Sequence, residues 1–361
     1  MSGARNITLY PWIKFCQNLI FWQAVWFLFF QTELSAADAI VLYAIYDIGT
    51  TVLEVPSGYL SDRLGRRITL LVSALSGLIA CLLLVTGDSF AAFAVAQMFF
   101  GASAAFASGT DTARLYESLV AQGRAAEVEA QELRAWRFTF TALALSAVTG
   151  GVMSLWWPAL PFLAAGLAFL AMFALCLRLV EPSRRLPTGP EVLRSASLRA
   201  ALVHPVLIWL FVLSVLMYGY SHLPFVFGQP FILEALDSAG LAAEAPVVSG
   251  AVSSVMMLVS VAASLIALRL RRRIGLAAIL LLAFAMQIGL AAVLAATGSA
   301  IAIAFLLLRM VPDSLSRPFI LARIQPLLGD ATRATYLSLQ SLVGRLLFAG
   351  SLFLASGLAD D

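Results

Sequence analysis

The sequence predicts an all-α polytopic membrane protein, and two observations lead to this fold class. Of its 361 residues, 61% are hydrophobic and only 12% are charged, whereas soluble domains average roughly 45–50% apolar and about 25% charged residues. A globular core cannot bury so large an apolar excess, because too much of it would face water. The apolar residues also occur in long runs, which match the roughly 20 residues of a membrane-spanning helix.

Polar segments divide the chain into eleven expected spans. The expected helices are 12–31, 36–56, 68–86, 90–119, 136–156, 160–179, 205–233, 247–270, 276–296, 300–324 and 335–358. The longest polar interruption, 181–199, separates the first six from the last five. We therefore expect two helical halves, 1–180 and 203–361, joined by a cytoplasmic linker at 181–202 and enclosing a central cavity.

The positions of arginine and lysine orient the chain. If the N-terminus is cytoplasmic, every loop on that side contains arginine, and the outer loops contain acidic residues but no arginine or lysine. This asymmetry is the positive-inside pattern of membrane proteins. We therefore expect a multi-pass protein of the plasma or inner membrane with a cytoplasmic N-terminus.

The loop between the second and third expected helices carries the most specific motif. Residues 58–67 read GYLSDRLGRR, which resembles the signature loop G-x-L-[AS]-D-[RK]-x-G-R-[RK] of the major facilitator superfamily. The resemblance, which is to the bacterial drug and metabolite transporters of that family, implies a fold that normally has twelve helices. The expected gate residues are Gly58, Asp62, Arg63, Gly65, Arg66 and Arg67.

The residue types in this loop suggest separate roles. Gly58 and Gly65 permit a close helix approach and a sharp turn. The resemblance implies that Asp62 contacts the N-terminal end of the eleventh helix, whose dipole favours an anion, and that it locks the halves in the outward-facing state. Arg66 and Arg67 can pair with acidic groups at the end of the fourth helix. The alternative is a basic turn that only sets the topology.

Three ionisable residues lie near the expected middle of the membrane. Asp47, Arg309 and Arg345 lie about 16, 13 and 15 Å into their helices at 1.5 Å per residue. The resemblance implies that the second and eleventh helices meet between the halves, so we expect Asp47 to pair with Arg345 or Arg309. Such charges are costly in a membrane and are candidates for function. The pair could be a static structural contact, or it could break and reform during transport.

Other charged residues lie closer to the cytoplasm. Glu54 shares a helical face with Asp47. Asp313 and Arg317 continue the face of Arg309, with a kink expected at Pro312. A further stripe on the fourth helix, with three-residue spacing, consists of Asp111, Arg114 and Glu117. We expect these residues to form a gate network, with proton binding as their second possible role.

Aromatic and polar residues accumulate on the first and seventh expected helices, which the resemblance implies line the cavity. Aromatic walls with a few polar groups suit an amphipathic organic solute. The outer aromatic residues could instead be interfacial anchors, and a lone histidine is more often structural. The cavity candidates are Gln23, Trp26, Tyr218, Tyr220, His222 and Gln229.

The combined pattern predicts a secondary active transporter that moves a small organic solute by alternating access, as proton-coupled efflux. Metabolite uptake or facilitated diffusion is one alternative, and a non-transporting membrane scaffold or sensor is another. The sequence contains no G-x-x-x-x-G-K-[ST] loop of an ATP-driven pump and no catalytic residue cluster. We expect a monomer that binds its solute, protons and lipid, with no enzymatic activity, cofactor, metal or nucleic-acid partner. Asp47 is the first candidate for coupling.

Overall fold

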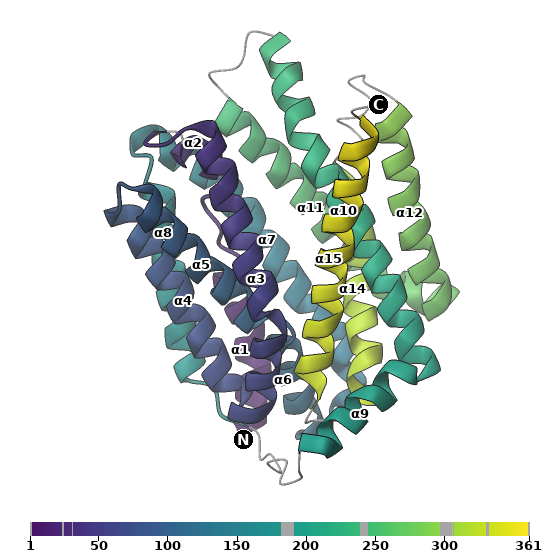
Figure 1. The fold of residues 1–361 in the computed structure, drawn as a ribbon. Helices are drawn as coiled ribbons and strands as arrows, with labels where there is room; N and C mark the ends of the chain where they lie inside the picture. The colour runs from purple at the N-terminus through teal and green to yellow at the C-terminus, as the bar shows by residue number, and fades with distance from the viewer. Residues whose placement is uncertain are drawn as a thin grey trace.

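The computed structural model describes residues 2–23, 25–30, 32–181, 191–238, 245–296, 305, 307–329 and 332–359. All regular elements of the described residues are α-helices or short 3-10 helices, and most run along one elongated bundle (Figure 1). We call the end at which Gly65 connects α3 to α4 the motif end. Helix α1 begins at the motif end, and α15 finishes at the opposite end (Figure 1). The all-α polytopic fold predicted from the composition is confirmed.

The elements up to residue 177 form what we call the N-terminal half. They are α1 (Ser2–Gln17), α2 (Trp26–Phe30), α3 (Ala36–Leu64), α4 (Arg66–Thr86), α5 (Phe90–Ala107), α6 (Thr110–Val120), η1 (Ala125–Glu127), α7 (Val128–Trp156) and α8 (Leu160–Leu177). Helices α3, α4, α5 and α8 pack side by side. An aromatic core with Phe30, Phe93 and Phe162 fills the space near the opposite end of this half.

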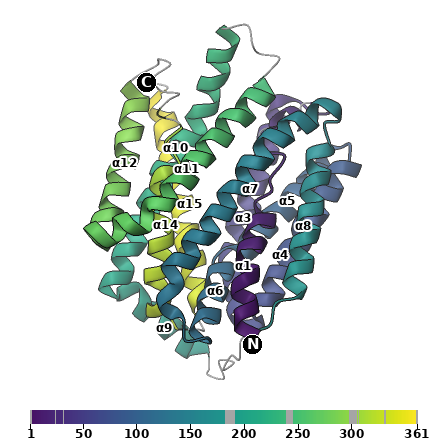
Figure 2. The ribbon, with the colours of Figure 1, turned by 180° about the vertical axis from the view of Figure 1, so that it is seen from behind.

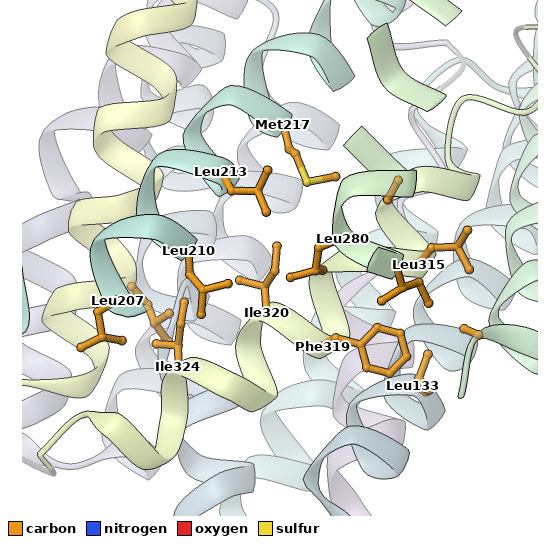
Figure 3. Packing of buried hydrophobic residues seen from close by; sticks show 14 of the residues in the cluster. Leu133, Leu207, Leu210, Leu213, Met217, Leu280, Leu315, Phe319, Ile320 and Ile324 are labelled. Carbon is orange, nitrogen blue, oxygen red and sulfur yellow. The ribbon is translucent and has the colours of Figure 1, made fainter. Parts of the chain in front are cut away.

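The remaining elements form the C-terminal half. They are α9 (Glu191–Val203), α10 (Pro205–Ser238), α11 (Ala245–Ile274), α12 (Leu276–Ala296), α14 (Val311–Ile324), η3 (Gln325–Leu327) and α15 (Arg333–Ala359). Their core is aliphatic, and Leu210 of α10, Leu280 of α12 and Ile320 of α14 converge in it (Figure 3). Leu133 of α7 also belongs to this core, so the first turns of α7 contact both halves.

The expected linker at 181–202 contains a helix that polarity alone does not predict. Helix α9 occupies its second part, and the axis turns by 76° between Ser197–Val203 and the start of α10. The break falls at His204, directly before Pro205, where proline restricts the preceding residue and lacks the N–H of a continuous helix. The part of the linker at 182–190 lies outside the described residues.

The first expected helix, 12–31, is broken. Helix α1 ends at Gln17, and α2 begins only at Trp26. Gly150 of α7 permits this irregular backbone to pack closely, since a Cβ there would lie 1.7 Å from the Phe21 carbonyl oxygen. The Gln23 amide donates a 2.9 Å hydrogen bond to the Leu143 carbonyl of α7. Non-helical backbone is tolerated at this depth because protein surrounds it.

Other expected helices also differ from the structure, and the one expected at 36–56 continues to Leu64. The helix expected at 90–119 is divided into α5 and α6 by Gly109, which has a positive φ of 67°. The helix expected at 136–156 begins eight residues earlier, at Val128. Helix α14 begins at Val311, with Pro312 in its first turn. Pro312 therefore starts this helix instead of kinking it, and Arg309 lies in the preceding turn.

Six helices among the described residues are long and apolar enough to cross a membrane. They are Arg66–Thr86, Phe90–Val120, Ala125–Trp156, Leu160–Leu177, Gly250–Ile274 and Leu276–Val293. The bent pair Ser197–Val203 and Pro205–Ser221 makes a seventh if it counts as one span. Helix α3 runs parallel to these spans (Figure 1) and carries Asp47, Glu54 and Asp62.

Candidate functional site

The carboxylate of Asp62 connects the two halves at the motif end. It lies on the last turns of α3 and is fully buried. It accepts hydrogen bonds from the Ala334 N–H at 3.2 Å, the Thr335 N–H at 2.9 Å and the Thr335 hydroxyl at 2.7 Å. These donors belong to the first turn of α15, where the N–H groups lack partners within the helix and the dipole favours an anion. Asp62 therefore caps α15 across the interface between the halves.

A chain of buried charges extends from this contact. Arg66 Nη1 lies 2.5 Å from Asp62 Oδ1, and Arg66 Nη2 lies 2.9 Å from Glu117 Oε1 on α6. Arg333 Nη1 of α15 reaches the same Glu117 oxygen at 3.3 Å. Two carboxylates and two guanidinium groups thus alternate. This arrangement compensates the charges of groups whose desolvation would otherwise be costly.

Glu181, just beyond α8, holds the start of α4. Its carboxylate accepts hydrogen bonds from the backbone N–H groups of Arg66 at 2.9 Å and Arg67 at 3.0 Å. It also lies 3.2 Å from Arg114 Nη1. Gly65, with φ of 108°, makes the turn, and a Cβ there would lie 3.0 Å from Glu181 Oε1. The turn therefore requires glycine for both its backbone angle and its space.

The other arginines of the motif have more peripheral contacts. Arg67 Nη2 donates to the Leu177 carbonyl at 2.8 Å, and Arg63 Nη1 donates to the Tyr59 hydroxyl at 2.9 Å. The sequence left open which acidic group pairs with Arg66 and Arg67. The structure brings Glu117 to Arg66, whereas the Arg67 side chain contacts a backbone carbonyl.

Two glycines allow α15 to lie directly on the N-terminal half. A Cβ at Gly58 of α3 would lie 2.6 Å from Ser338 Oγ and 3.0 Å from the Ala334 carbonyl oxygen. A Cβ at Gly109, between α5 and α6, would lie 2.9 Å from Leu337 Cβ. The closed contact at the motif end therefore depends on small residues as well as on charge.

A cavity of about 820 Å³ lies between the halves. Helices α1, α3, α5, α6 and α7 form one wall, and α10, α14 and α15 form the other. Aromatic side chains, including Trp22, Trp136 and Tyr218, line it together with charged groups. The charged lining residues are Lys14, Asp47, Glu54, Asp111, Glu132, Arg309, Asp313, Arg317 and Arg345.

One ion pair crosses the cavity from wall to wall. Arg345 Nη1 of α15 lies 2.7 Å from Asp47 Oδ1 of α3, and the Asp47 side chain remains 45% exposed. Of the two partners considered for Asp47, the structure places Arg345 in contact. Arg309, in the turn before α14, contacts Met310 Sδ at 3.7 Å.

The other expected coupling residues have separate environments. Asp313 is buried and accepts hydrogen bonds from Ser221 at 3.0 Å and from Gln287 at 3.2 Å. Glu54 is buried at the cavity wall, and its Oε1 has no hydrogen-bond partner among the described residues. Asp111 binds Lys14 Nζ at 2.6 Å.

The expected solute-binding residues are only partly at the cavity. Tyr218 lines it. Tyr220 instead packs edge-to-face against Phe284 of α12, and Trp26 packs against Phe30. Gln23 is bound to the backbone of α7, as described above, and serves the broken first helix. The side chains of His222 and Gln229 lie outside the described residues.

Sequence reasoning missed Lys14, Glu132 and Glu181 as site residues. Glu132 is buried on the first turns of α7, but it lies before residue 136, where the helix was expected to begin. Glu181 follows the last apolar residues of its helix and was assigned to the linker. Glu132 and Glu181 stand outside the expected spans, where they resemble ordinary loop residues, whereas Lys14 lies in the first turn of the expected span 12–31.

These features define a class of protein: a polytopic helical membrane protein in which two sets of helices enclose a charged cavity. A sequence model of the Major Facilitator Superfamily matches residues 12–351. The chain therefore belongs to the Major Facilitator Superfamily, which places it among membrane transporters and not among enzymes. The superfamily inferred from residues 58–67 is confirmed, and the narrower resemblance to its bacterial drug and metabolite transporters stays a prediction.

Solved structures of transporters share the fold. The human organic anion transporter MFSD10 (TETRAN) is 15% identical, with a TM-score of 0.69, and the match covers 97% of this chain and 92% of that one. A bacterial homologue of the iron transporter ferroportin in an outward-facing state is also 15% identical, with a TM-score of 0.72 and coverage of 100% and 93%. Identities this low establish the fold alone. No curated protein sequence matches the chain significantly.

Proposed function

We propose that this protein is a secondary active transporter that exports a small organic solute by alternating access, in exchange for protons. One observation carries the proposal. The two halves are joined at the motif end by the buried contact between Asp62 and the first turn of α15, while a charged cavity lies between them further along the bundle. A gate on one side of a binding cavity is the arrangement that alternating access requires.

The orientation of the gate follows from the arginine distribution. We place the motif end in the cytoplasm, because the loops at this end carry the arginines. The closed contact at Asp62 then corresponds to an outward-facing conformation. Transport requires this contact to break and the halves to close at the opposite end.

The cavity lining supports a small organic solute. Its volume of about 820 Å³ is within the usual range of small-molecule sites. Trp22, Trp136 and Tyr218 offer aromatic surface, and Arg317, an exposed side chain, lines the same cavity. Such a lining suits a solute with an apolar body and at least one polar or charged group.

The ion pair between Asp47 and Arg345 supports coupling. Because its two residues belong to opposite halves, their separation would remove the cation from beside the carboxylate. A carboxylate that loses a neighbouring positive charge binds a proton more readily. The pair would therefore link the proton affinity of Asp47 to the conformation of the protein.

The proposal is tested with purified protein in liposomes. A panel of radiolabelled organic solutes is screened with and without an imposed pH gradient. We expect at least one solute to be concentrated only when the gradient is present. Equilibration of a solute without the gradient would favour a facilitator. Accumulation in the direction of the proton flow would favour a symporter. No flux of any solute across a broad panel would favour the scaffold or sensor.

A further inference from the structure

The first turns of α7 hold a buried carboxyl group that the transport scheme has not used. The Glu132 side chain borders the cavity, yet the residue is only 4% exposed. Its Oε1 atom is buried and has no hydrogen-bond partner among the described residues. A carboxylate in such a place is costly if it is charged and lacks a partner.

The groups around Glu132 do not neutralise it. Three residues interact with the Glu132 carboxyl group through a hydroxyl or a charge: Tyr10 and Lys14 of α1 and Asp111 of α6. Lys14 Nζ already lies 2.6 Å from Asp111 Oδ2, so one ammonium group serves two carboxylates. The Tyr10 hydroxyl is buried and has no well-aligned hydrogen-bond partner among the described residues, although it lies close enough to act on Glu132. With all three charges present, the cluster would carry one uncompensated negative charge.

Among the described residues, no cation of the other elements that pack against α7 forms an ion pair with Glu132. On α11, Arg271 lies 2.7 Å from Glu129. Arg309, Asp313 and Arg317 line the same cavity from the C-terminal half. Among the described residues, a proton is therefore the simplest means of neutralising this cluster.

Packing between the halves separates Glu132 from the motif end. The next residue, Leu133, lies in the C-terminal core beside Phe319 (Figure 3). Val128 and Ala135, one turn to either side, belong to a cluster that also includes Ala322 of α14. Helix α7 lies alongside α11 and α14 (Figure 2). Opening the motif end would divide both clusters and admit water to Glu132.

We propose that Glu132 is a proton-binding site of the transport cycle, loaded while the motif end is closed and emptied when that end opens. A hydronium ion from cavity water gives its proton to a carboxyl oxygen of Glu132. The same proton passes to water at the motif end after opening, and the Lys14–Asp111 pair stays intact. This inference rests on the proposed proton coupling. It adds Glu132 to the coupling scheme as a second proton-binding group beside Asp47, whose carboxylate has Arg345 as a partner.

Infrared difference spectroscopy of the purified protein tests the loaded state without any solute. Spectra at neutral pH are compared for the wild type, Glu132→Gln and Glu129→Gln. Glu129 is the matched control, because it lies one turn away on α7 and is paired with Arg271. We expect the C=O stretching band of a protonated carboxyl group to be lost in Glu132→Gln and retained in Glu129→Gln. A wild-type spectrum identical to that of Glu132→Gln in this region would overturn the proposal.

Two further measurements test emptying and coupling. Adding Asp62→Asn, which weakens the gate, should reduce the Glu132 band; an undiminished band would contradict emptying on opening. In liposomes, Glu132→Gln should lower gradient-driven accumulation at least tenfold, and full accumulation would overturn the role in transport. If instead the wild type shows the band but no gradient-driven transport, the proposed coupling fails for the protein as a whole, independently of the protonation result.

Discussion

Replacing Asp62 with asparagine should shift the protein from the closed to the open state at the motif end. The carboxylate holds α15 through three hydrogen bonds and also binds Arg66 Nη1 at 2.5 Å. Asparagine has nearly the same size and keeps one oxygen acceptor. It removes the negative charge from the N-terminus of α15 and directs an N–H₂ donor toward groups that are themselves donors.

Two contributions determine the size of the effect. An anion at a helix N-terminus contributes about 0.3–2 kcal/mol. Removing one partner of a buried ion pair costs about 3–5 kcal/mol, but Arg66 keeps Glu117 at 2.9 Å and the Ser61 hydroxyl at 3.0 Å. We therefore expect Asp62→Asn to destabilise the closed state by about 2–4 kcal/mol in total. At 1.4 kcal/mol per factor of ten, this lowers the ratio of closed to open protein about 30- to 700-fold.

Cysteine labelling measures this shift. Ala322→Cys places a thiol on α14, where Ala322 is 5% exposed and packs against the N-terminal half. The three native cysteines are replaced first. A membrane-impermeant maleimide supplied at the motif end should react at least tenfold faster in Asp62→Asn than in the parent protein.

The matched control is Asp38→Asn. Asp38 lies on the same helix but in its first turn, near the opposite end, where it binds the Ser35 hydroxyl at 2.7 Å. This control should leave the labelling rate unchanged. Equal labelling rates in Asp62→Asn and the parent protein would refute the gate, and would leave the motif as a turn that only sets the topology.

Two further predictions concern the contacts between the halves. Gly58→Val should prevent closure at the motif end, since even a Cβ would lie 2.6 Å from Ser338 Oγ. The thiol of Ala322→Cys should again react faster with the maleimide. The control Gly289→Val, at a glycine with open space around it, should leave the labelling rate unchanged. Asp47→Asn should abolish gradient-driven accumulation, because Arg345 loses its carboxylate partner at 2.7 Å. The double variant Asp47→Asn with Arg345→Gln should recover expression if the single variant folds poorly, and an Asp47→Asn protein that still concentrates solute would exclude Asp47 from coupling.

The fold class and the position of the loop that carries Asp62 could be predicted from the sequence. A membrane requires long apolar runs, so the composition alone was sufficient for the all-α polytopic fold. Residues 58–67 combine glycine, acid and base in a spacing that few other loops share. The intramembrane charges Asp47 and Arg345 were also visible, because a charged residue interrupts an apolar run conspicuously.

Other features depended on contacts between distant segments. The break after Gln17 is stabilised by the close approach of Gly150 on another helix, which no local pattern reveals. Glu132 and Glu181 stand at the ends of apolar runs, where charged residues are ordinary. Only the packing of α7 between the halves and the turn beyond α8 shows what these two carboxylates contact.

Paired distance measurements test alternating access most directly. Spin labels at Val120 of α6 and Val203 of α9 span the halves at the motif end, and labels at Trp156 of α7 and Ala296 of α12 span them at the opposite end. All four residues are exposed. Introducing Asp62→Asn should lengthen the first distance and shorten the second. Two distances that stay constant, or that change in the same direction, would contradict alternating access about this cavity.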